Sequence, residues 1–114
     1  MLNQSVAQLL NAQITAEFYS AYLYLDFSSY FQETGLDGFA NWYQVQAQEE
    51  RDHAMLFYQY LHNNSAKVAL EAVAKPERKA ADTMGILKAG LEHEVYVTCL
   101  LYTSPSPRDR SLSR

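Results

Sequence analysis

Residues 46–54 read QAQEERDHA and place Glu50 three positions before His53. At about 100° per residue, both side chains fall within the apolar stripe of a long helix. Burying an unpaired charge costs free energy, so a carboxylate and an imidazole that face a core need a partner there. This stretch therefore predicts a helical bundle with a polar centre. The other members of its stripe are Phe39, Tyr43, Ala47, Ala54, Phe57 and Leu61.

Three amphipathic segments predict three helices, over residues 3–33, 38–63 and 82–98. The first segment contains no glycine or proline. Apolar residues recur along each segment at the helical period, and no segment alternates as a strand does. The sequence thus indicates an all-α fold. The stripe of the third helix is predicted to contain Thr83, Ile86, Leu87, Gly90, Leu91 and Val97.

The connections predict how these helices are arranged. The short turn TGLDG, residues 34–38, makes the first two helices antiparallel neighbours, with Asp37 as the N-cap of the second. Residues 64–81 lack a strong pattern and include Pro76. A linker of this length can run along the bundle and return the chain to the end where the second helix begins. Asp82 is the expected N-cap of the third helix.

The bulk composition excludes several classes of protein. With 114 residues the chain forms one domain at most, and a formal charge of −4 argues against binding to nucleic acid. No apolar run is long enough for a membrane span, and no signal peptide is evident. A single cysteine, Cys99, is consistent with a reducing compartment, but it lies inside a C-terminal segment that we interpret below as non-native. We therefore expect a cytoplasmic protein with no nucleic-acid or membrane partner.

The last sixteen residues break the helical pattern, with two prolines, four serines and three arginines. A disordered basic tail is the ordinary interpretation of such a segment. However, residues 99–109, CLLYTSPSPRD, are also the translation of a transposase adaptor that is ligated to DNA fragments for sequencing. We therefore interpret residues 1–98 as the native domain and residues 99–114 as a non-native tail. The natural protein would then continue beyond this point.

Four ionisable residues occupy core-facing positions on the three predicted helices: Glu17, Glu50, His53 and Glu94. The glutamates cannot neutralise one another, and no Lys or Arg shares their stripes. Carboxylates with an imidazole suit iron, manganese or zinc, and Glu-x-x-His spacing lets both side chains reach the same ion. Any one glutamate alone could be tolerated at a stripe edge. Their joint occurrence favours two divalent cations, as in di-metal carboxylate bundles.

Other residues allow two interpretations each. Glu49 borders the stripe and either faces solvent or makes a secondary metal contact. Tyr24 shares the stripe of Glu17 and is either a core tyrosine with a satisfied hydroxyl or a redox-active neighbour of the metals. His62 and His93 are expected on the surface. Aromatic residues off the core stripes indicate a subunit interface; these are Tyr19, Tyr22 and Trp42.

The segments AEFYSAYLYLDFSSYF, GLDGFANWYQVQAQEERDHAMLFYQYL and GLEHE together resemble a bacterial non-haem ferritin. The resemblance covers residues 1–98, about three-fifths of such a subunit. It implies an antiparallel four-helix bundle of the ferritin-like di-iron superfamily, truncated here to three helices. It also implies a short fifth helix and assembly into a hollow 24-subunit shell.

The resemblance assigns roles to the core-facing residues. Glu17, Glu50 and His53 would bind the first iron, with Glu50 bridging to a second iron that Glu94 also binds. Tyr24 matches a tyrosine beside the iron centre and is our candidate catalytic residue. Glu49 matches a residue that helps to hold a third iron in some bacterial members. Haem is not expected, because Arg51 stands where bacterioferritins place a haem-ligating methionine.

The implied activity is that of a ferroxidase, an oxidoreductase that oxidises Fe(II) with O₂ or peroxide and deposits Fe(III) mineral for iron storage and detoxification. The fourth helix and its ligands are missing, so we expect the chain by itself to be inactive. Two alternatives remain open from the sequence. One is a rubrerythrin-like di-iron peroxidase, and the other is a helical interaction bundle without metal.

Overall fold

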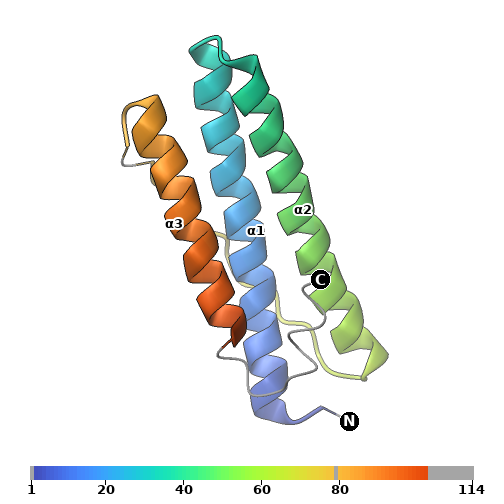
Figure 1. The fold of residues 1–114 in the computed structure, drawn as a ribbon. Helices are drawn as coiled ribbons and strands as arrows, with labels where there is room; N and C mark the ends of the chain where they lie inside the picture. Colours follow the sequence, from blue (N-terminus) through green and yellow to red (C-terminus); the bar gives the residue numbers. More distant parts are fainter. Residues whose placement is uncertain (1, 79, 103–114) are drawn as a thin grey trace.

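The computed structural model describes residues 2–78 and 80–102. Within these ranges the chain forms three helices and no strand: α1 (Gln4–Glu33), α2 (Asp37–Asn63) and α3 (Thr83–Tyr102). Figure 1 shows α1 flanked by α2 on one side and α3 on the other. The all-α prediction is confirmed. The helices begin and end within one residue of their expected bounds, except that α3 continues to Tyr102. The rest of the interpreted tail, from residue 103, lies outside the described residues.

The ends of the helices follow local chemistry. Gly35, with φ of 77°, follows the end of α1 in a left-handed conformation that favours glycine. The prediction that Asp37 caps α2 is wrong by one residue, because Leu36 occupies the N-cap and Asp37 begins the helix. A carboxylate in the first turn still complements the helix dipole. At α3 the predicted cap is confirmed, since the Gly85 N–H donates a 2.8 Å hydrogen bond to Asp82 Oδ1.

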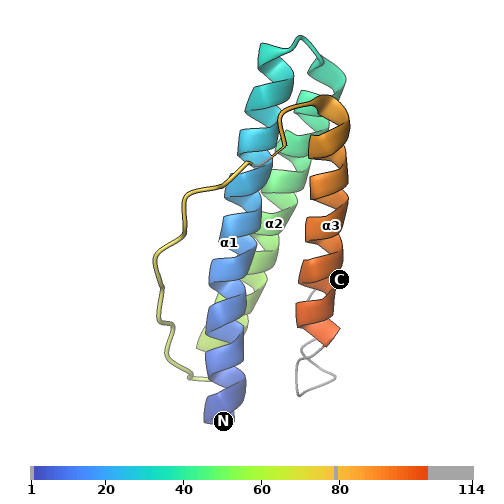
Figure 2. The ribbon, with the colours of Figure 1, turned by 90° about the vertical axis from the view of Figure 1, so that its left-hand side faces the viewer.

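The segment between α2 and α3 runs back along the outside of α1, as Figure 2 shows. Near its start, the Asn11 amide donates to the Lys67 carbonyl at 3.0 Å and accepts from the Ala69 N–H at 2.8 Å. Near its end, Arg78 lies 3.5 Å from a carboxylate oxygen of Asp26. These contacts return the chain to the end of the bundle where α2 begins, as the length of the linker predicts.

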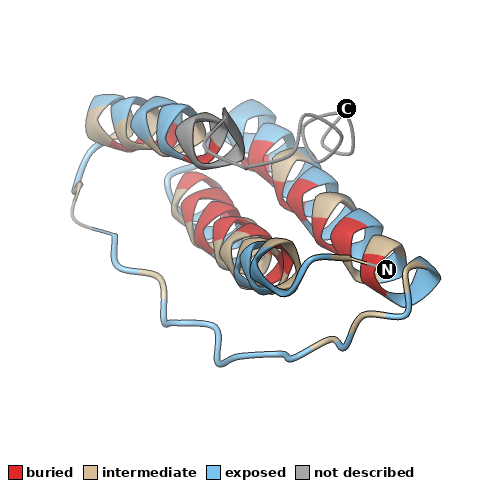
Figure 3. Ribbon diagram, turned by 90° about the horizontal axis from the view of Figure 1, so that it is seen from below, coloured by how far each residue is buried: buried red, intermediate tan, exposed pale blue. Residues whose placement is uncertain are grey.

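The core lies mainly between α1 and α2, which pack along their whole length. Figure 3 shows the buried faces of these two helices turned toward each other. The core has two apolar clusters, separated by the polar residues of the candidate site. One cluster contains Leu23, Tyr24, Phe27, Phe31, Ala40, Tyr43, Ala47 and Ile86. The other contains Leu10, Ile14, Ala54, Phe57 and Leu61.

Two predicted core residues, Phe39 and Leu91, lie at the surface, with 42% and 68% of their area exposed. They border an apolar groove of about 700 Å³ between α2 and α3. The prediction fails because the described parts of α2 and α3 do not pack along each other. The inner wall of the groove includes Tyr24 and Glu94, so the groove leads to the polar centre of the bundle.

Across the described residues, no helix is both long enough and apolar enough to cross a membrane.

Candidate metal centre

Three predicted ligands meet between α1 and α2. Glu17 comes from the middle of α1, and Glu50 and His53 lie one turn apart on α2. One ligand atom from each residue lies within 4.8 Å of the other two. His53 Nδ1 is 3.6 Å from Glu17 Oε2 and 3.6 Å from Glu50 Oε2. The structure therefore brings together three groups that sequence spacing places on facing helices.

The two carboxylates of this group are buried and incompletely satisfied. Glu17 is 1% exposed and Glu50 is 4% exposed. Gln13 donates a 3.0 Å hydrogen bond to Glu17 Oε1. Glu17 Oε2 and Glu50 Oε2 have no hydrogen-bond partner among the described residues. Buried polar atoms are normally paired, so two free oxygens that face one imidazole mark a place suited to a cation.

The three groups change one another's affinity for protons. The neighbouring Glu17 and Glu50 raise the pKa of His53 to about 10. Burial, reinforced by Glu17, raises the pKa of Glu50 to about 8. Burial favours the neutral form of Glu17, but His53, Glu50 and Gln13 outweigh it and hold the pKa of Glu17 below its ordinary value. At neutral pH this centre therefore holds protons in positions that a metal ion can take.

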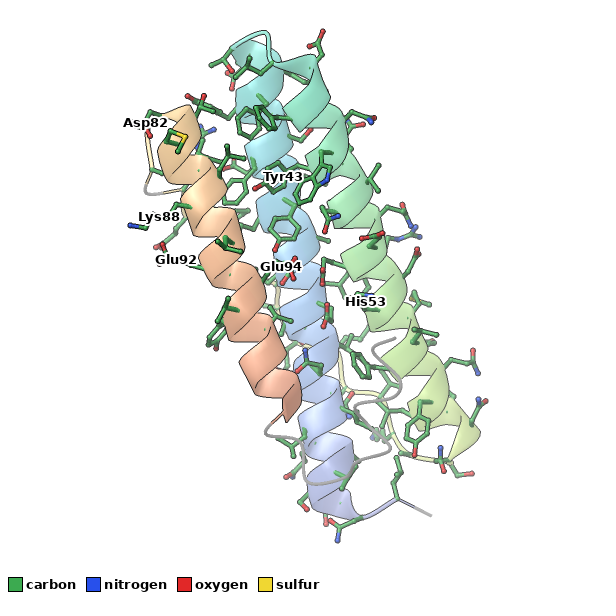
Figure 4. The ribbon with its side chains drawn as sticks, in the orientation of Figure 1. Tyr43, His53, Asp82, Lys88, Glu92 and Glu94 are labelled. Carbon is green, nitrogen blue, oxygen red and sulfur yellow. The ribbon has the colours of Figure 1, made fainter. Side chains whose placement is uncertain are left out.

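Glu94 reaches the same interior from α3. Figure 4 shows Glu94 pointing toward α1 and α2, while Lys88 and Glu92 project away from the bundle. The Tyr24 hydroxyl donates a 2.6 Å hydrogen bond to Glu94 Oε1. Burial and this carboxylate raise the pKa of Tyr24, so its hydroxyl remains protonated. Glu94 therefore lies beside the Glu17, Glu50 and His53 group without belonging to it.

A model of the ferritin-like domain matches residues 7–103. The chain belongs to the ferritin family. Among curated relatives, the bacterial non-heme ferritin of Campylobacter jejuni is 38% identical over 98 residues, covering 86% of this chain and 59% of the relative. That of Staphylococcus saprophyticus is 31% identical over 102 residues, covering 90% and 61%. The chain thus spans about three-fifths of the length of these relatives.

Solved ferritin structures share the arrangement of the helices. An engineered closed form of Archaeoglobus fulgidus ferritin superposes with a TM-score of 0.86 at 40% identity, covering 90% of this chain and 62% of that one. The open-pore ferritin from the same archaeon gives a TM-score of 0.85 at 40% identity, with 89% and 62% coverage. The predicted ferritin-like fold is confirmed: this chain holds three helices of a four-helix architecture.

Glu49 does not join the three ligands in this ferritin chain. It is exposed, whereas Glu50, the next residue, is buried. Adjacent helix positions point about 100° apart, so the two carboxylates cannot face the same ion in this arrangement. The third-iron role of Glu49 stays a prediction.

The prediction that His93 lies on the surface is wrong. His93 is half-buried, and its Nε2 lies 2.7 Å from the hydroxyl of Ser20. Burial lowers the pKa of His93, although the nearby Glu94 partly opposes the shift. Ser20 itself was not singled out. Its position between Glu17 and Tyr24 on one helical stripe was the available signal.

Proposed function

We propose that the protein to which this chain belongs stores iron and oxidises Fe(II) at a two-ion centre in the bundle. The observation that carries the proposal is the convergence of Glu17, Glu50 and His53, where two buried carboxylate oxygens have no hydrogen-bond partner among the described residues. Membership of the ferritin family and the bacterial non-heme ferritin relatives support it. Iron is here a substrate that enters the centre and leaves it as mineral.

In this proposal Glu17, Glu50 and His53 bind the first Fe(II). Glu50 also contacts the second Fe(II), which Glu94 approaches from α3. Oxygen and imidazole ligands suit Fe(II), and carboxylates favour Fe(III) over Fe(II) because their charge is negative. The two ions lose one electron each, and O₂ or peroxide takes them up. No haem is proposed, because Arg51 follows Glu50.

Tyr24 is proposed as the residue that orients Glu94, the carboxylate that approaches the second iron. Its hydroxyl is buried and donates to Glu94, so it fixes one oxygen of Glu94 and leaves the other free. The hydrogen bond from Tyr24 to Glu94 also holds the Tyr24 ring beside the proposed iron centre, where it could take part in redox steps.

The proposed whole protein assembles as a 24-subunit shell in the cytoplasm. Exposed aromatic residues support an interface with other subunits: Tyr22 of α1 is 54% exposed, and Trp42, which lines the groove beside α2, is 52% exposed. For the chain as it stands, we propose that the open groove between α2 and α3 leaves the centre incomplete. Size-exclusion chromatography after iron loading tests this. A soluble shell that mineralises iron would contradict the proposal for the chain alone.

Anaerobic titration with Zn²⁺ and Fe²⁺ tests the centre itself. The chain is completed with the C-terminal part of the Campylobacter relative and compared with its Glu50→Gln variant. Glu92→Gln is the matched control, because it removes the same charge from an exposed carboxylate of α3. We expect Glu50→Gln to weaken binding at least about tenfold and Glu92→Gln to leave it unchanged. Equal binding by all three proteins would instead support a bundle without a metal function.

A further inference from the structure

Two hydrogen bonds join α1 to α3 beside the candidate metal centre. Ser20 and Tyr24, one turn apart on α1, meet His93 and Glu94, which are consecutive on α3. Among the described residues, these are the side-chain hydrogen bonds that connect the two helices. In the described part of the chain α3 packs along α1 and meets α2 mainly where Tyr43 contacts Gly90, so the rotation of α3 depends largely on its contacts with α1. Whatever fixes His93 therefore also affects where Glu94 stands.

The hydroxyl of Ser20 determines which nitrogen of His93 carries a proton. Ser20 Oγ lies 3.0 Å from the Ala16 carbonyl, to which its single proton is donated. With that assignment of the proton, His93 Nε2–H donates the 2.7 Å contact to Ser20 Oγ. The same nitrogen donates whether the ring is neutral or charged. Since Ser20 is fully buried, water does not compete for this hydrogen bond.

Aromatic neighbours fix the plane of the His93 ring. Tyr24 meets the ring edge-on, with centroids 5.8 Å apart and planes at 86°. Tyr19 lies at 6.0 Å, and Tyr96 of α3 lies at 6.3 Å. Tilted and edge-on contacts at these distances are favourable. The imidazole is thus held by one hydrogen bond and three tyrosines, with Tyr24 contacting both His93 and Glu94.

We propose that His93 is a positioning residue: by donating Nε2–H to Ser20 it sets the rotation of α3 and holds the carboxylate of Glu94 beside the metal centre. This inference rests on the proposed function, because Glu94 matters only if a metal ion binds there. His93 itself does not contact the ion. The rival explanation is that the Ser20–His93 bond stabilises the fold without placing Glu94.

A measurement without metal tests the geometry on the full chain. We expect ¹⁵N NMR of the imidazole to show the Nε2–H tautomer at neutral pH, and we expect a slowly exchanging hydroxyl proton from Tyr24. His93→Phe keeps an aromatic ring but removes the donor, so the Tyr24 signal should be lost. His93→Gln restores an N–H donor and should recover it. An Nδ1–H tautomer, or a Tyr24 signal unchanged in His93→Phe, would overturn the proposal.

Co²⁺ titration of the completed protein separates positioning from stability. We expect His93→Phe to weaken binding about tenfold, as loss of a residue that orients a ligand does, and His93→Gln to recover most of the loss. In a Glu94→Gln background, His93→Phe should cost less than about twofold, because the carboxylate that it positions is already gone. Ile86→Val is the control, since it loosens the same helix in the core without touching either hydrogen bond.

The two proposals fail in different ways. If the completed protein and its Glu50→Gln variant bind Co²⁺ equally or not at all, the proposed function is wrong. If Co²⁺ binding requires Glu50 but His93→Phe weakens it equally with and without Glu94, the positioning role is wrong and the bond serves stability alone.

Discussion

The hydroxyl of Tyr24 donates a 2.6 Å hydrogen bond to the carboxylate of Glu94 and so links the first helix to the third. Tyr24 is 1% exposed, and both Tyr24 and Glu94 line the groove between α2 and α3. A buried hydrogen bond to a charged group is stronger than one between neutral groups. This pair therefore connects the packing of the helices to the placement of a candidate iron ligand.

Replacing Tyr24 by Phe should separate these two roles. The ring remains to pack against Phe27 and Tyr43, so we expect the fold to persist, with a loss of about 1.5–3 kcal/mol in the free energy of unfolding from the missing hydrogen bond. Glu94 loses its donor, so Fe(II) oxidation by the completed protein should slow by about tenfold or more. Stopped-flow absorbance measures the rate. An unchanged rate would show that Tyr24 is only a core residue.

Metal binding should release protons. At pH 7 both His53, with a pKa of about 10, and Glu50, with a pKa of about 8, are mainly protonated in the metal-free chain. A cation that takes both ligands must displace about two protons, so its affinity should fall as the pH is lowered from 8 to 6. Calorimetry in two buffers with different ionisation enthalpies measures the number of protons released per bound cation. Release of no protons would contradict the assignment of these ligands.

The stability of the metal-free chain should fall as the pH rises. Unfolding returns the pKa of Glu50 to 4.5 and that of His53 to 6.5. At pH values between the unfolded and the folded pKa of either group, the folded chain therefore holds more protons than the unfolded chain. Linkage then lowers the free energy of unfolding as the pH rises through about 5–8 for Glu50 and about 6.5–10 for His53. Glu17 acts in the opposite direction, because its lowered pKa removes stability only in acid.

The Glu50→Gln variant isolates the first of these contributions. It cannot ionise, so its stability relative to the unchanged chain should increase as the pH rises from 5 to 9. Urea unfolding at both pH values provides the comparison. If the difference between the two proteins is the same at pH 5 and pH 9, Glu50 does not have the raised pKa on which the account depends.

Gly90 should be needed for the approach of α3 to Tyr43. A Cβ built on Gly90 collides with the Tyr43 hydroxyl, which lies directly against the α3 backbone. Gly90→Ala should therefore destabilise the chain by about 1–3 kcal/mol, and adding Tyr43→Phe should recover part of the loss. Gly38→Ala is the matched control, because no atom lies within 4 Å of its added Cβ. Thermal unfolding measures all four proteins. Equal effects at Gly38 and Gly90 would contradict the close contact.

Much of the fold and the candidate site follows from the sequence because both depend on helical periodicity. The positions of Glu17, Glu50 and His53 on apolar stripes were enough to predict that they face one another, and the structure brings them together. Gly35 ends α1 and Asp82 caps α3. Both effects depend on local backbone chemistry, so they can be predicted from a single sequence.

What the sequence did not predict depends on how helices sit against one another. The Ser20–His93 hydrogen bond requires a register between α1 and α3 that spacing within either helix does not define. Phe39 and Leu91 have the right period for a core but border a groove, since their exposure is set by the distance between α2 and α3. The missed hydrogen bond and the wrong burial of Phe39 and Leu91 both depend on the position of α3, which has few contacts with neighbouring helices.

Anomalous X-ray scattering at the iron edge, from crystals of the completed protein loaded anaerobically with Fe²⁺, tests the central claim most directly. We predict a peak about 2.0–2.2 Å from His53 Nδ1 and from a carboxylate oxygen of both Glu17 and Glu50, the range typical of such metal ligands. A second peak is expected within reach of Glu94. Iron found only on exposed carboxylates, with Glu17, Glu50 and His53 free of metal, would contradict the account.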